Sequence, residues 1–580
     1  MAFRPNTVIG LRELRSARRK ARSLVLSVGI FSVAANLLML TGPLFMLQVY
    51  DRVLSSRSVE TLTALFGLVC FLFLLMGLID VARNRIMHRV GAQFQSAMEL
   101  RVFSASLQDG AVSGNGDVIL GGMRDLDAIQ RFMTSPLVLA LFDLPWAPLF
   151  LAAVYLFHPF LGIVATIGCL LLVLTTYLNQ LFSEHALQRA MIASRQADRM
   201  NDLYRDEGEV IQSLGMRSAA FRRWRKSRDE ATAATVENAD RSTSFSVFSR
   251  TFRLFLQSAM LAAGAWLVLR QELTPGAMIA SSILMGRALS PIEQIVGGWS
   301  TIQRAKDGWN RLADLLSRRP PQPDRTALPR PQGGLQVSSL SVVPPGQQSA
   351  TLRSVSFKLE PGQALGVIGP SGAGKSTLAR ALIGAWPPAG GTIRLGGATL
   401  DQYDPDVLGQ LMGYLPQQVT LFDGTIAENI ARLSASPDPE RVVNAARAAA
   451  AHEMILELPH GYDTPVTQTG GRLSGGQIQR IGLARTLYSD PVLFVLDEPN
   501  SNLDNEGSAA LNAAIRSIKA RGGSVIIMAH RPAAIHECEM LLVLSGGVVR
   551  SFGPRDEVLR QSTRNAEEIV RSKGLGGGVT

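Results

Sequence analysis

Two long stretches without a charged residue dominate the start of this 580-residue chain. Residues 23–50 and 61–79 contain no Asp, Glu, Lys or Arg. As a helix, the second stretch would extend about 28 Å, close to the ~30 Å thickness of a bilayer core. The chain therefore begins with segments suited to crossing a membrane.

Four further apolar runs extend this pattern to six predicted spans, at 136–157, 160–182, 246–269 and 275–300. Only His158 and Pro159 separate the third span from the fourth, which predicts a tight reversal. The first run is too long for a signal peptide and other spans follow it, so we expect it to be retained. A mean hydropathy of +0.15 beside a net charge of +11 fits a chain that is half membrane domain and half soluble domain.

The distribution of Lys and Arg predicts the orientation. Basic residues crowd the leader before the first span, the segment between spans two and three, and FRRWRKSR at 221–228. The alternate loops are short, so the positive-inside rule places both termini of this multi-pass membrane protein in the cytoplasm. The charge is spread rather than gathered in one patch, so no nucleic-acid partner is expected. Three scattered cysteines indicate neither a disulfide framework nor a metal site.

The composition changes after the sixth span, where RRPPQPDRTALPRPQGG has five prolines in seventeen residues. Such a segment is stiff and extended, as linkers are. We therefore expect a basic cytoplasmic leader (1–22), a transmembrane domain with cytoplasmic helical extensions (23–317), a linker (318–334), a soluble domain (335–572) and a flexible tail (573–580).

The soluble domain contains a predicted phosphate-binding loop near its start. The apolar strand QALGVIG runs into GPSGAGKST, which is G-x-x-x-x-G-K-[ST] between a strand and a helical pattern. The glycines let backbone amides point at phosphates, Lys375 can reach the β- and γ-phosphates, and Ser376 offers a hydroxyl to Mg²⁺. The predicted nucleotide-binding residues here are Gly369, Pro370, Ser371, Gly372, Ala373, Gly374, Lys375, Ser376 and Thr377.

A second apolar strand, PVLFVLDEP at 491–499, ends in two carboxylates. Asp497 is suited to Mg²⁺, and Glu498 is suited to polarising the water that attacks the γ-phosphate. A strand that ends in Asp-Glu is unremarkable alone. Because a phosphate loop precedes it by about 120 residues, we expect these carboxylates to act on a magnesium–nucleotide complex.

LSGGQ at 473–477 resembles the signature of ATP-binding-cassette (ABC) ATPases. Other elements of that family match in order. Gln417 resembles the glutamine that senses Mg²⁺ and couples to the membrane domain, Asp504 the D-loop aspartate, and His530 the switch histidine at the γ-phosphate. The resemblance covers residues 335–572 and, through weaker motifs, the six spans. It implies an all-α six-helix transmembrane domain of ABC exporter type followed by an α/β P-loop nucleotide-binding domain, acting as an ATPase with ATP and Mg²⁺.

The resemblance also implies two copies of the chain. In this family the signature of one subunit closes over the phosphate loop of another. Ser474, Gly475, Gly476 and Gln477 would then contact ATP held by the second copy. Each chain carries one membrane domain and one set of motifs, so we expect a homodimer with shared sites.

One departure concerns the adenine. Family members often carry an aromatic residue that stacks on the base, about 25 residues before the phosphate loop. The corresponding stretch here is LSVVPPG, with Pro344 at that position. Stacking must be weaker or come from elsewhere, which leaves selectivity for ATP over GTP open.

Three longer sequence segments indicate which branch of the ABC family this chain resembles. FDLPWAPLF (142–150), PLFMLQVYDRVLSSRSVETL (43–62) and LFDGTIAENIAR (421–432) resemble exporters of bacterial type I secretion, in the branch for alkaline proteases and repeats-in-toxin proteins. That branch implies ATP-driven export of a secreted polypeptide with a periplasmic membrane-fusion adaptor and an outer-membrane channel. The alternative is an exporter of lipids or drugs. A non-transporting regulator is disfavoured because Glu498, His530 and LSGGQ are intact.

The short leader before the first span indicates how an exported polypeptide would be recognised. Related bacteriocin exporters carry an N-terminal cysteine peptidase, but about 22 residues precede the first span here, without Cys or His. That is too short for a folded peptidase. We expect an uncleaved C-terminal signal.

Two charges in apolar stretches have competing explanations. Asp143 lies in FDLPWAPLF, where Pro145 and Pro148 either start a helix or bend it to shape a cavity. Arg287 lies about twelve residues into the sixth span, and Glu293 is about 240° around the helix from it, a poor partner. Arg287 must therefore meet another span or a water-filled path.

Overall fold

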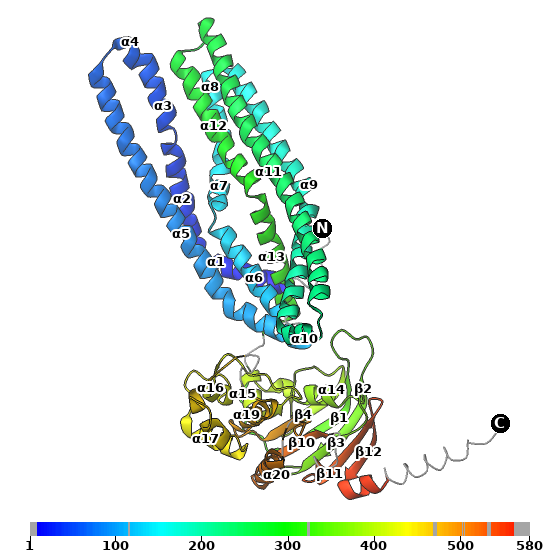
Figure 1. The fold of residues 1–580 in the computed structure, drawn as a ribbon. Helices are drawn as coiled ribbons and strands as arrows, with labels where there is room; N and C mark the ends of the chain where they lie inside the picture. The colour runs from blue at the N-terminus through cyan, green and yellow to red at the C-terminus, as the bar shows by residue number, and fades with distance from the viewer. Residues whose placement is uncertain are drawn as a thin grey trace, which may run out of the picture. The chain divides into compact units, whose positions relative to one another are not determined.

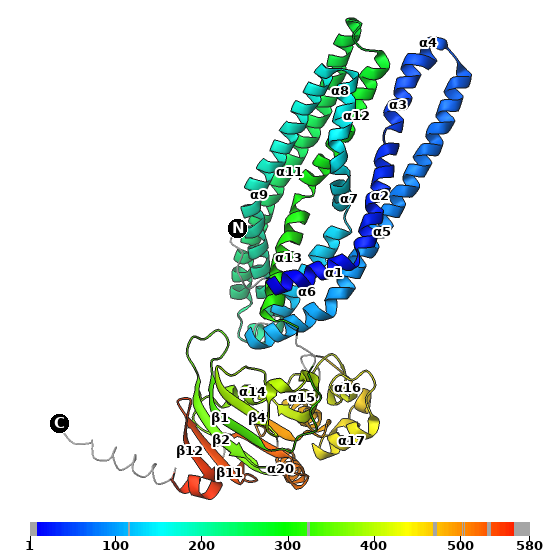
Figure 2. The ribbon, with the colours of Figure 1, turned by 180° about the vertical axis from the view of Figure 1, so that it is seen from behind.

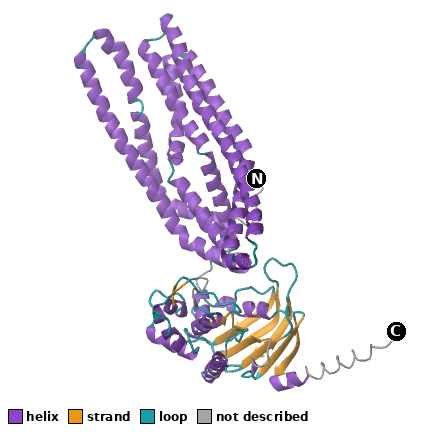
Figure 3. Cartoon of the chain, viewed as in Figure 1, coloured by secondary structure: helices purple, strands orange, loops and turns teal. Residues whose placement is uncertain are grey.

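The computed structural model describes residues 8–113, 117–321, 325–467, 473–501, 503, 505–529 and 535–561. The chain divides into two units, residues 1–110 with 116–321 and residues 111–115 with 322–580. The described part of the first unit is helical, and the strands belong to the second (Figure 3). The change of unit at Pro321 falls within the proline-rich segment, and the predicted tail at 573–580 lies outside the described residues.

Long helices make up the first unit (Figure 1). Their bounds are α1 (Val8–Lys20), α2 (Arg22–Leu38), α3 (Thr41–Gln48), the π-helix η2 (Val49–Val53), α4 (Leu54–Ser56), α5 (Val59–Ser113), α6 (Asp117–Met133), α7 (Pro136–Asp143), the 3₁₀ turn η3 (Leu144–Trp146), α8 (Ala147–Phe157), α9 (Pro159–Asp206), α10 (Gly208–Ser213), α11 (Arg217–Leu269), α12 (Pro275–Gly297) and α13 (Trp299–Arg318).

All six predicted spans are helical. Within the described residues, four helical stretches are long and apolar enough to cross a membrane: Arg22–Ser56, Val59–Ala111, Pro136–Phe157 and Arg217–Leu269. The fourth predicted span lies at the start of α9, with its described apolar part at Pro159–Thr175, and the sixth corresponds to α12. Phe71 and Leu74 of α5 are among many exposed large apolar side chains, as expected for surfaces that meet lipid.

The loop between the first two spans is shorter than predicted. After the first span the helix continues to Ser56, and Arg57 ends it with a left-handed backbone (φ 54°). The expected reversal at His158 is confirmed, because its extended backbone (φ −161°) separates α8 from α9 and its side chain accepts a hydrogen bond from the Phe160 amide.

The third span is broken in its middle. Helix α7 ends at Asp143, a 3₁₀ turn carries Pro145, and Pro148 lies in the first turn of α8. The prolines therefore interrupt the span, and each occupies the start of a new helical segment, where its missing N–H is least costly. That the interruption shapes a cavity stays a prediction.

Helices α9 and α11 run side by side, as both ribbon views show (Figures 1 and 2). A glycine permits their close approach, because a Cβ at Gly168 would lie 2.0 Å from a methyl carbon of Leu256. Helix α12 packs against α11, α8, α3 and α9. A cluster that includes Leu172, Met260, Met285 and Leu289 forms the core between these helices.

The described part of the second unit contains three sheets. Their strand orders are β12-β11-β3-β10-β9-β6, β2-β1-β4-β5 and β7-β8. The strands are β1 (Leu335–Val342), β2 (Leu352–Leu359), β3 (Ala364–Ile368), β4 (Gly390–Leu395), β5 (Ala398–Thr399), β6 (Met412–Leu415), β7 (Gly424–Thr425), β8 (Pro465–Val466), β9 (Leu493–Asp497), β10 (Ser524–Ala529), β11 (Met540–Ser545) and β12 (Val548–Pro554). The helices are α14 (Lys375–Leu382), α15 (Pro405–Leu411), α16 (Ile426–Ile430), α17 (Pro439–Ala448), α18 (His452–Leu456), α19 (Gly475–Leu487) and α20 (Asn505–Ala520), with 3₁₀ turns η4 (Leu400–Gln402) and η5 (Gly461–Asp463).

The central strands of the six-stranded sheet are buried on both faces. Along β10, Val525 and Ile527 join the core that contains α19 and α20, while Ile526 and Met528 join the core that contains α14 and the four-stranded sheet. Strands covered on both sides read as continuous apolar runs, which explains QALGVIG and PVLFVLD. The parallel strands β3, β6, β9 and β10 end at the same edge of the sheet, where ligands of α/β folds bind. The predicted fold class is confirmed.

Candidate nucleotide-binding site

The phosphate loop connects β3 to α14, and its glycines are required by its shape. Gly372 and Gly374 have φ of 78° and 100°, and Gly374 caps α14 in a left-handed conformation. A Cβ at Gly369 would lie 2.2 Å from the Leu544 carbonyl oxygen. Pro370 and Ser371 are exposed, Ala373 is buried and Thr377 is half-buried.

Lys375 is held inside this loop. Its side chain is 6% exposed, and Nζ donates to the carbonyl oxygens of Gly369 at 2.9 Å and Pro370 at 3.2 Å. Burial lowers the pKa of Lys375, and the carboxylates of Glu498 and Asp497 act in the opposite direction. A cation held only by neutral carbonyls can turn to phosphate oxygens without breaking an ion pair.

Asp497 and Ser376 form a pair that fits a metal ion. Asp497 is 3% exposed, and its Oδ1 is buried without a hydrogen-bond partner among the described residues. Burial raises the pKa of Asp497, while a side-chain hydrogen bond with Ser376 lowers it. Mg²⁺ is usually held by one or two protein oxygens plus phosphates and water, so this carboxylate and hydroxyl could supply the protein's share.

Glu498 and Gln417 meet across the edge of the sheet. The Gln417 amide donates to Glu498 Oε2 at 3.1 Å, although 81 positions separate the two residues. Glu498 has a left-handed backbone (φ 51°), and its N–H donates to the Met528 carbonyl oxygen at 3.0 Å. Such a backbone costs about 1–3 kcal/mol in a non-glycine residue, and it is typical of sites where side-chain direction matters.

The signature forms the start of α19. Ser474 caps the helix: its hydroxyl accepts from the Gln477 amide at 3.3 Å, and its own N–H donates to Gln477 Oε1 at 2.8 Å. Ser474 and Gly475 are exposed, and the Gly475 and Gly476 amides fall in the first turn of the helix. Free first-turn amides and the helix dipole favour an anion here.

Sequence reasoning missed Gln479, which ties the signature helix α19 to the segment that follows β9. This side chain is 3% exposed, and its amide donates to the Pro499 carbonyl oxygen, directly after Glu498. The available signal was spacing: Gln479 lies four positions after Gly475 and therefore one helical turn beyond that residue of the motif. A second missed pair is Tyr414 and Arg380, which are hydrogen-bonded near Asp497; burial raises the pKa of Tyr414.

Three other predictions have different outcomes. Asp504 and His530 lie outside the described residues. The strand before His530 is described, and its Met528 pairs in register with Asp497. Pro344 is buried and its carbonyl oxygen accepts from the Gln347 amide at 3.1 Å, so it offers no exposed ring face to a base.

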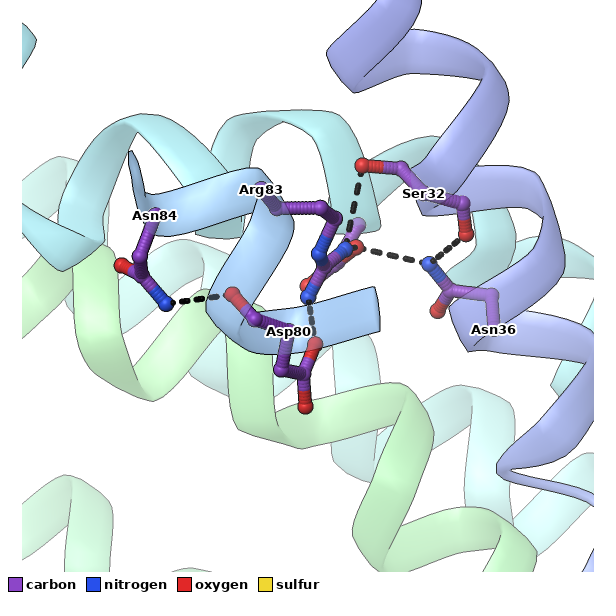
Figure 4. A network of polar contacts seen from close by, with 6 residues as sticks. Ser32, Asn36, Asp80, Arg83 and Asn84 are labelled. Carbon is purple, nitrogen blue, oxygen red and sulfur yellow. Dashed lines mark hydrogen bonds and ion pairs between the residues drawn. The ribbon is translucent and has the colours of Figure 1, made fainter. Parts of the chain in front are cut away.

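The first unit, called the membrane unit from here on, contains a polar network around Arg83 (Figure 4). Arg83 is 4% exposed and donates to Asp143 Oδ1 at 2.9 Å, Asp80 Oδ1 at 2.7 Å and the Ser32 hydroxyl at 3.0 Å. The Asn36 amide also donates to Asp143, at 2.6 Å. The network joins α2, α5 and α7. Asp143 is therefore paired within the unit, which settles its environment.

Comparisons with known proteins agree with this geometry. The profile for the ABC transporter transmembrane region matches residues 25–291, and the ABC transporter profile matches residues 352–501. The type I secretion system ATP-binding protein PrsD of Rhizobium meliloti (strain 1021) is 41% identical over 563 residues, 97% of this chain and 96% of that protein. The cyclolysin secretion/processing ATP-binding protein CyaB of Bordetella pertussis is 30% identical over 558 residues, 93% of this chain and 76% of that protein.

A solved structure of a bacterial Atm1-family ABC exporter with ATP bound has the same fold. Its TM-score is 0.80 at 22% identity, and the match covers 95% of this chain and 98% of that chain. The apolar helices, the phosphate loop, the signature and the near full-length similarity agree: this chain belongs to the ABC transporters, as a membrane-spanning ATPase among the type I secretion system ATP-binding proteins.

Proposed function

We propose that this protein uses ATP to export a polypeptide across the bacterial inner membrane as the ATPase component of a type I secretion system. The observation that carries the proposal is the 41% identity to PrsD across 97% of the chain, because it spans both the membrane unit and the nucleotide unit. The similarity to CyaB, a cyclolysin secretion protein, points the same way and favours a polypeptide over a lipid or drug.

At each site, Lys375 would bind the β- and γ-phosphates. Ser376, Asp497 and Gln417 would hold Mg²⁺, which supplies charge neutralisation and orientation for the phosphates. Glu498 would take the proton of the attacking water. The hydrogen bond from Gln417 would hold the Glu498 carboxylate in place. His530 would contact the γ-phosphate. The buried, unpartnered Oδ1 of Asp497 supports the metal assignment.

The functional unit would be a homodimer with two shared ATP sites. Ser474, Gly475, Gly476 and Gln477 would contact the nucleotide bound by the other copy, together with Asp504. The exposed, capped start of α19 supports this, because its free first-turn amides are suited to binding an anion. The γ-phosphate of a nucleotide held by the phosphate loop of the other copy would be that anion.

Mixed dimers test the sharing. Dimers of Lys375→Ala and Ser474→Arg chains should contain one intact site and one doubly broken site, whereas each variant homodimer has two broken sites. ATPase activity in the mixture above that of either homodimer is expected. Activity equal to the homodimers' would contradict independent shared sites.

Both termini would lie in the cytoplasm, and a periplasmic membrane-fusion adaptor with an outer-membrane channel would complete the route. The basic segments before α2 and at 221–228 support this orientation. The substrate would carry an uncleaved C-terminal signal, which the resemblance to repeats-in-toxin exporters supports.

Secretion from cells tests the proposal. The transporter, adaptor and channel are expressed with a repeats-in-toxin polypeptide, either intact or without its last ~50 residues, the length scale of a small folded segment. We expect the intact form alone in the medium. Equal secretion of both forms would contradict the C-terminal signal, and efflux of a lipophilic dye without polypeptide export would favour the lipid or drug alternative.

A further inference from the structure

The exposed side of α12 is polar, unlike the other membrane helices. Every residue of α12 is described, and none of its large hydrophobic side chains is exposed, whereas α5 exposes Phe71 (61%) and Leu74 (65%). Arg287 and Gln294 are exposed on α12, and Ser290 between them is half-buried. These three positions share one face, since they follow helical spacing. We call Arg287, Ser290 and Gln294 the polar stripe.

The cation of the polar stripe has no anionic partner among the described residues. No hydrogen bond or ion pair joins Arg287 to any other described residue. Glu293, the only acidic residue of α12, is paired with Arg253 of α11, with 2.5 Å between Nε and Oε2. Further polar groups adjoin the stripe: the Gln294 amide donates to the Ser290 hydroxyl at 3.3 Å, and a Cβ at Gly286 would lie 3.4 Å from Gln257 Nε2.

Lipid is a poor neighbour for this face, because an ionised arginine deep in a span is costly unless it meets water or a partner. A dry contact with the same face of a second copy is also poor. In a two-fold dimer the same patch meets itself, so two Arg287 guanidinium groups would approach each other. Water between them avoids that repulsion.

We propose that the polar stripe lines a water-filled path through the membrane domain and binds carboxylate-bearing segments of the exported polypeptide as they pass. This inference rests on the proposed export of a polypeptide. A guanidinium binds a carboxylate through two parallel hydrogen bonds, and Ser290 and Gln294 add donors and acceptors that can hydrogen-bond to the backbone of any extended segment. A cleft lined by one sign of charge concentrates the opposite charge about 10- to 1,000-fold, so acid-rich segments are favoured over basic ones.

Crosslinking from the stripe tests contact with the polypeptide. A photoreactive phenylalanine analogue replaces Ser290 or Gln294 in the full-length transporter, and Leu74 of α5 serves as the matched lipid-facing control. Export of a repeats-in-toxin polypeptide is arrested by a fast-folding domain fused to its N-terminus. We expect adducts to the polypeptide from positions 290 and 294 but not from 74. Adducts only to the second copy of the transporter, or equal polypeptide adducts from all three positions, would overturn the proposal.

Charge variants test the chemistry. Arg287→Glu should slow export of an acid-rich polypeptide about tenfold, the lower end of the focusing effect, and should slow a variant of that polypeptide with its repeat Asp changed to Asn much less. Arg287→Lys should retain most export. Arg195→Glu, at an exposed position on α9, is the control for net charge.

An equal loss for both polypeptides would indicate a merely structural Arg287 and contradict the inference. Failure of the proposed function would give a different result: the wild-type protein would export neither polypeptide. If the wild type exports the polypeptide but no adducts form from the polar stripe, the inference is contradicted and the proposed function is not.

Discussion

Replacing Arg83 by methionine should destabilise the membrane unit strongly. Arg83 supplies the cation of the network, and methionine keeps a similar length but leaves the carboxylates of Asp143 and Asp80 without it. Asp143 is 15% exposed and Asp80 is 36% exposed, so Asp143 loses more. Removing one partner of a buried pair costs about 3–5 kcal/mol, and the partial exposure of Asp80 favours the lower value of ~3 kcal/mol.

That loss can be measured by thermal unfolding of the full-length protein in nanodiscs, followed by tryptophan fluorescence. At ~2–4 °C per kcal/mol for a domain of 150–250 residues, the unfolding midpoint should fall by roughly 6–12 °C. Arg85→Met is the matched control, because Arg85 is exposed on the same helix and surface changes stay within about 0.5 kcal/mol.

The double variant Arg83→Met with Asp143→Asn should recover part of the loss, because it no longer leaves the least exposed carboxylate uncompensated. A midpoint for Arg83→Met within 2 °C of the Arg85→Met value, a gap of under about 1 kcal/mol, would refute the reasoning, since the network would then contribute little to stability.

Four other predictions concern the nucleotide unit. Glu498→Gln should keep ATP binding and lose about 100-fold or more of turnover, as an amide cannot accept the water's proton; near wild-type turnover in purified protein would exclude Glu498 as the base. Lys375→Ala should weaken nucleotide binding itself, measured by calorimetry, and unchanged affinity would remove its phosphate role. Because burial raises the pKa of Asp497 and a metal needs the ionised form, Mn²⁺ binding should fall on acidification at a higher pH than for an ordinary aspartate; constant affinity down to the ordinary range would contradict this. Burial raises the pKa of Cys538 to about 12, so maleimide should label it at pH 7 only after unfolding, and rapid labelling of native protein would count against that burial.

Local motifs were predictable because they depend on neighbours in sequence. The glycines of the phosphate loop, the two carboxylates at the end of β9 and the cap at Ser474 each follow from a short pattern, and the structure has the corresponding loop, strand end and helix start. The parallel sheet was predictable in class because its strands are continuous apolar runs.

Long-range contacts were not predictable in this way. The Gln417–Glu498 and Gln479–Pro499 hydrogen bonds depend on the order of strands and on how α19 packs beside them. The partners of Asp143 come from α2 and α5, 107 and 60 positions away, and no periodicity within a single span identifies them. Glycine contacts such as Gly168 with Leu256 likewise appear only once two helices pack.

ATP-driven movement of a polypeptide is the central claim, and inverted inner-membrane vesicles test it most directly. Vesicles from cells that also produce the adaptor receive a labelled repeats-in-toxin polypeptide, and protease then digests what remains outside. The account predicts protected polypeptide only with ATP, only with the intact C-terminus, and not with the Glu498→Gln transporter. Equal protection without ATP, or with Glu498→Gln, would contradict it.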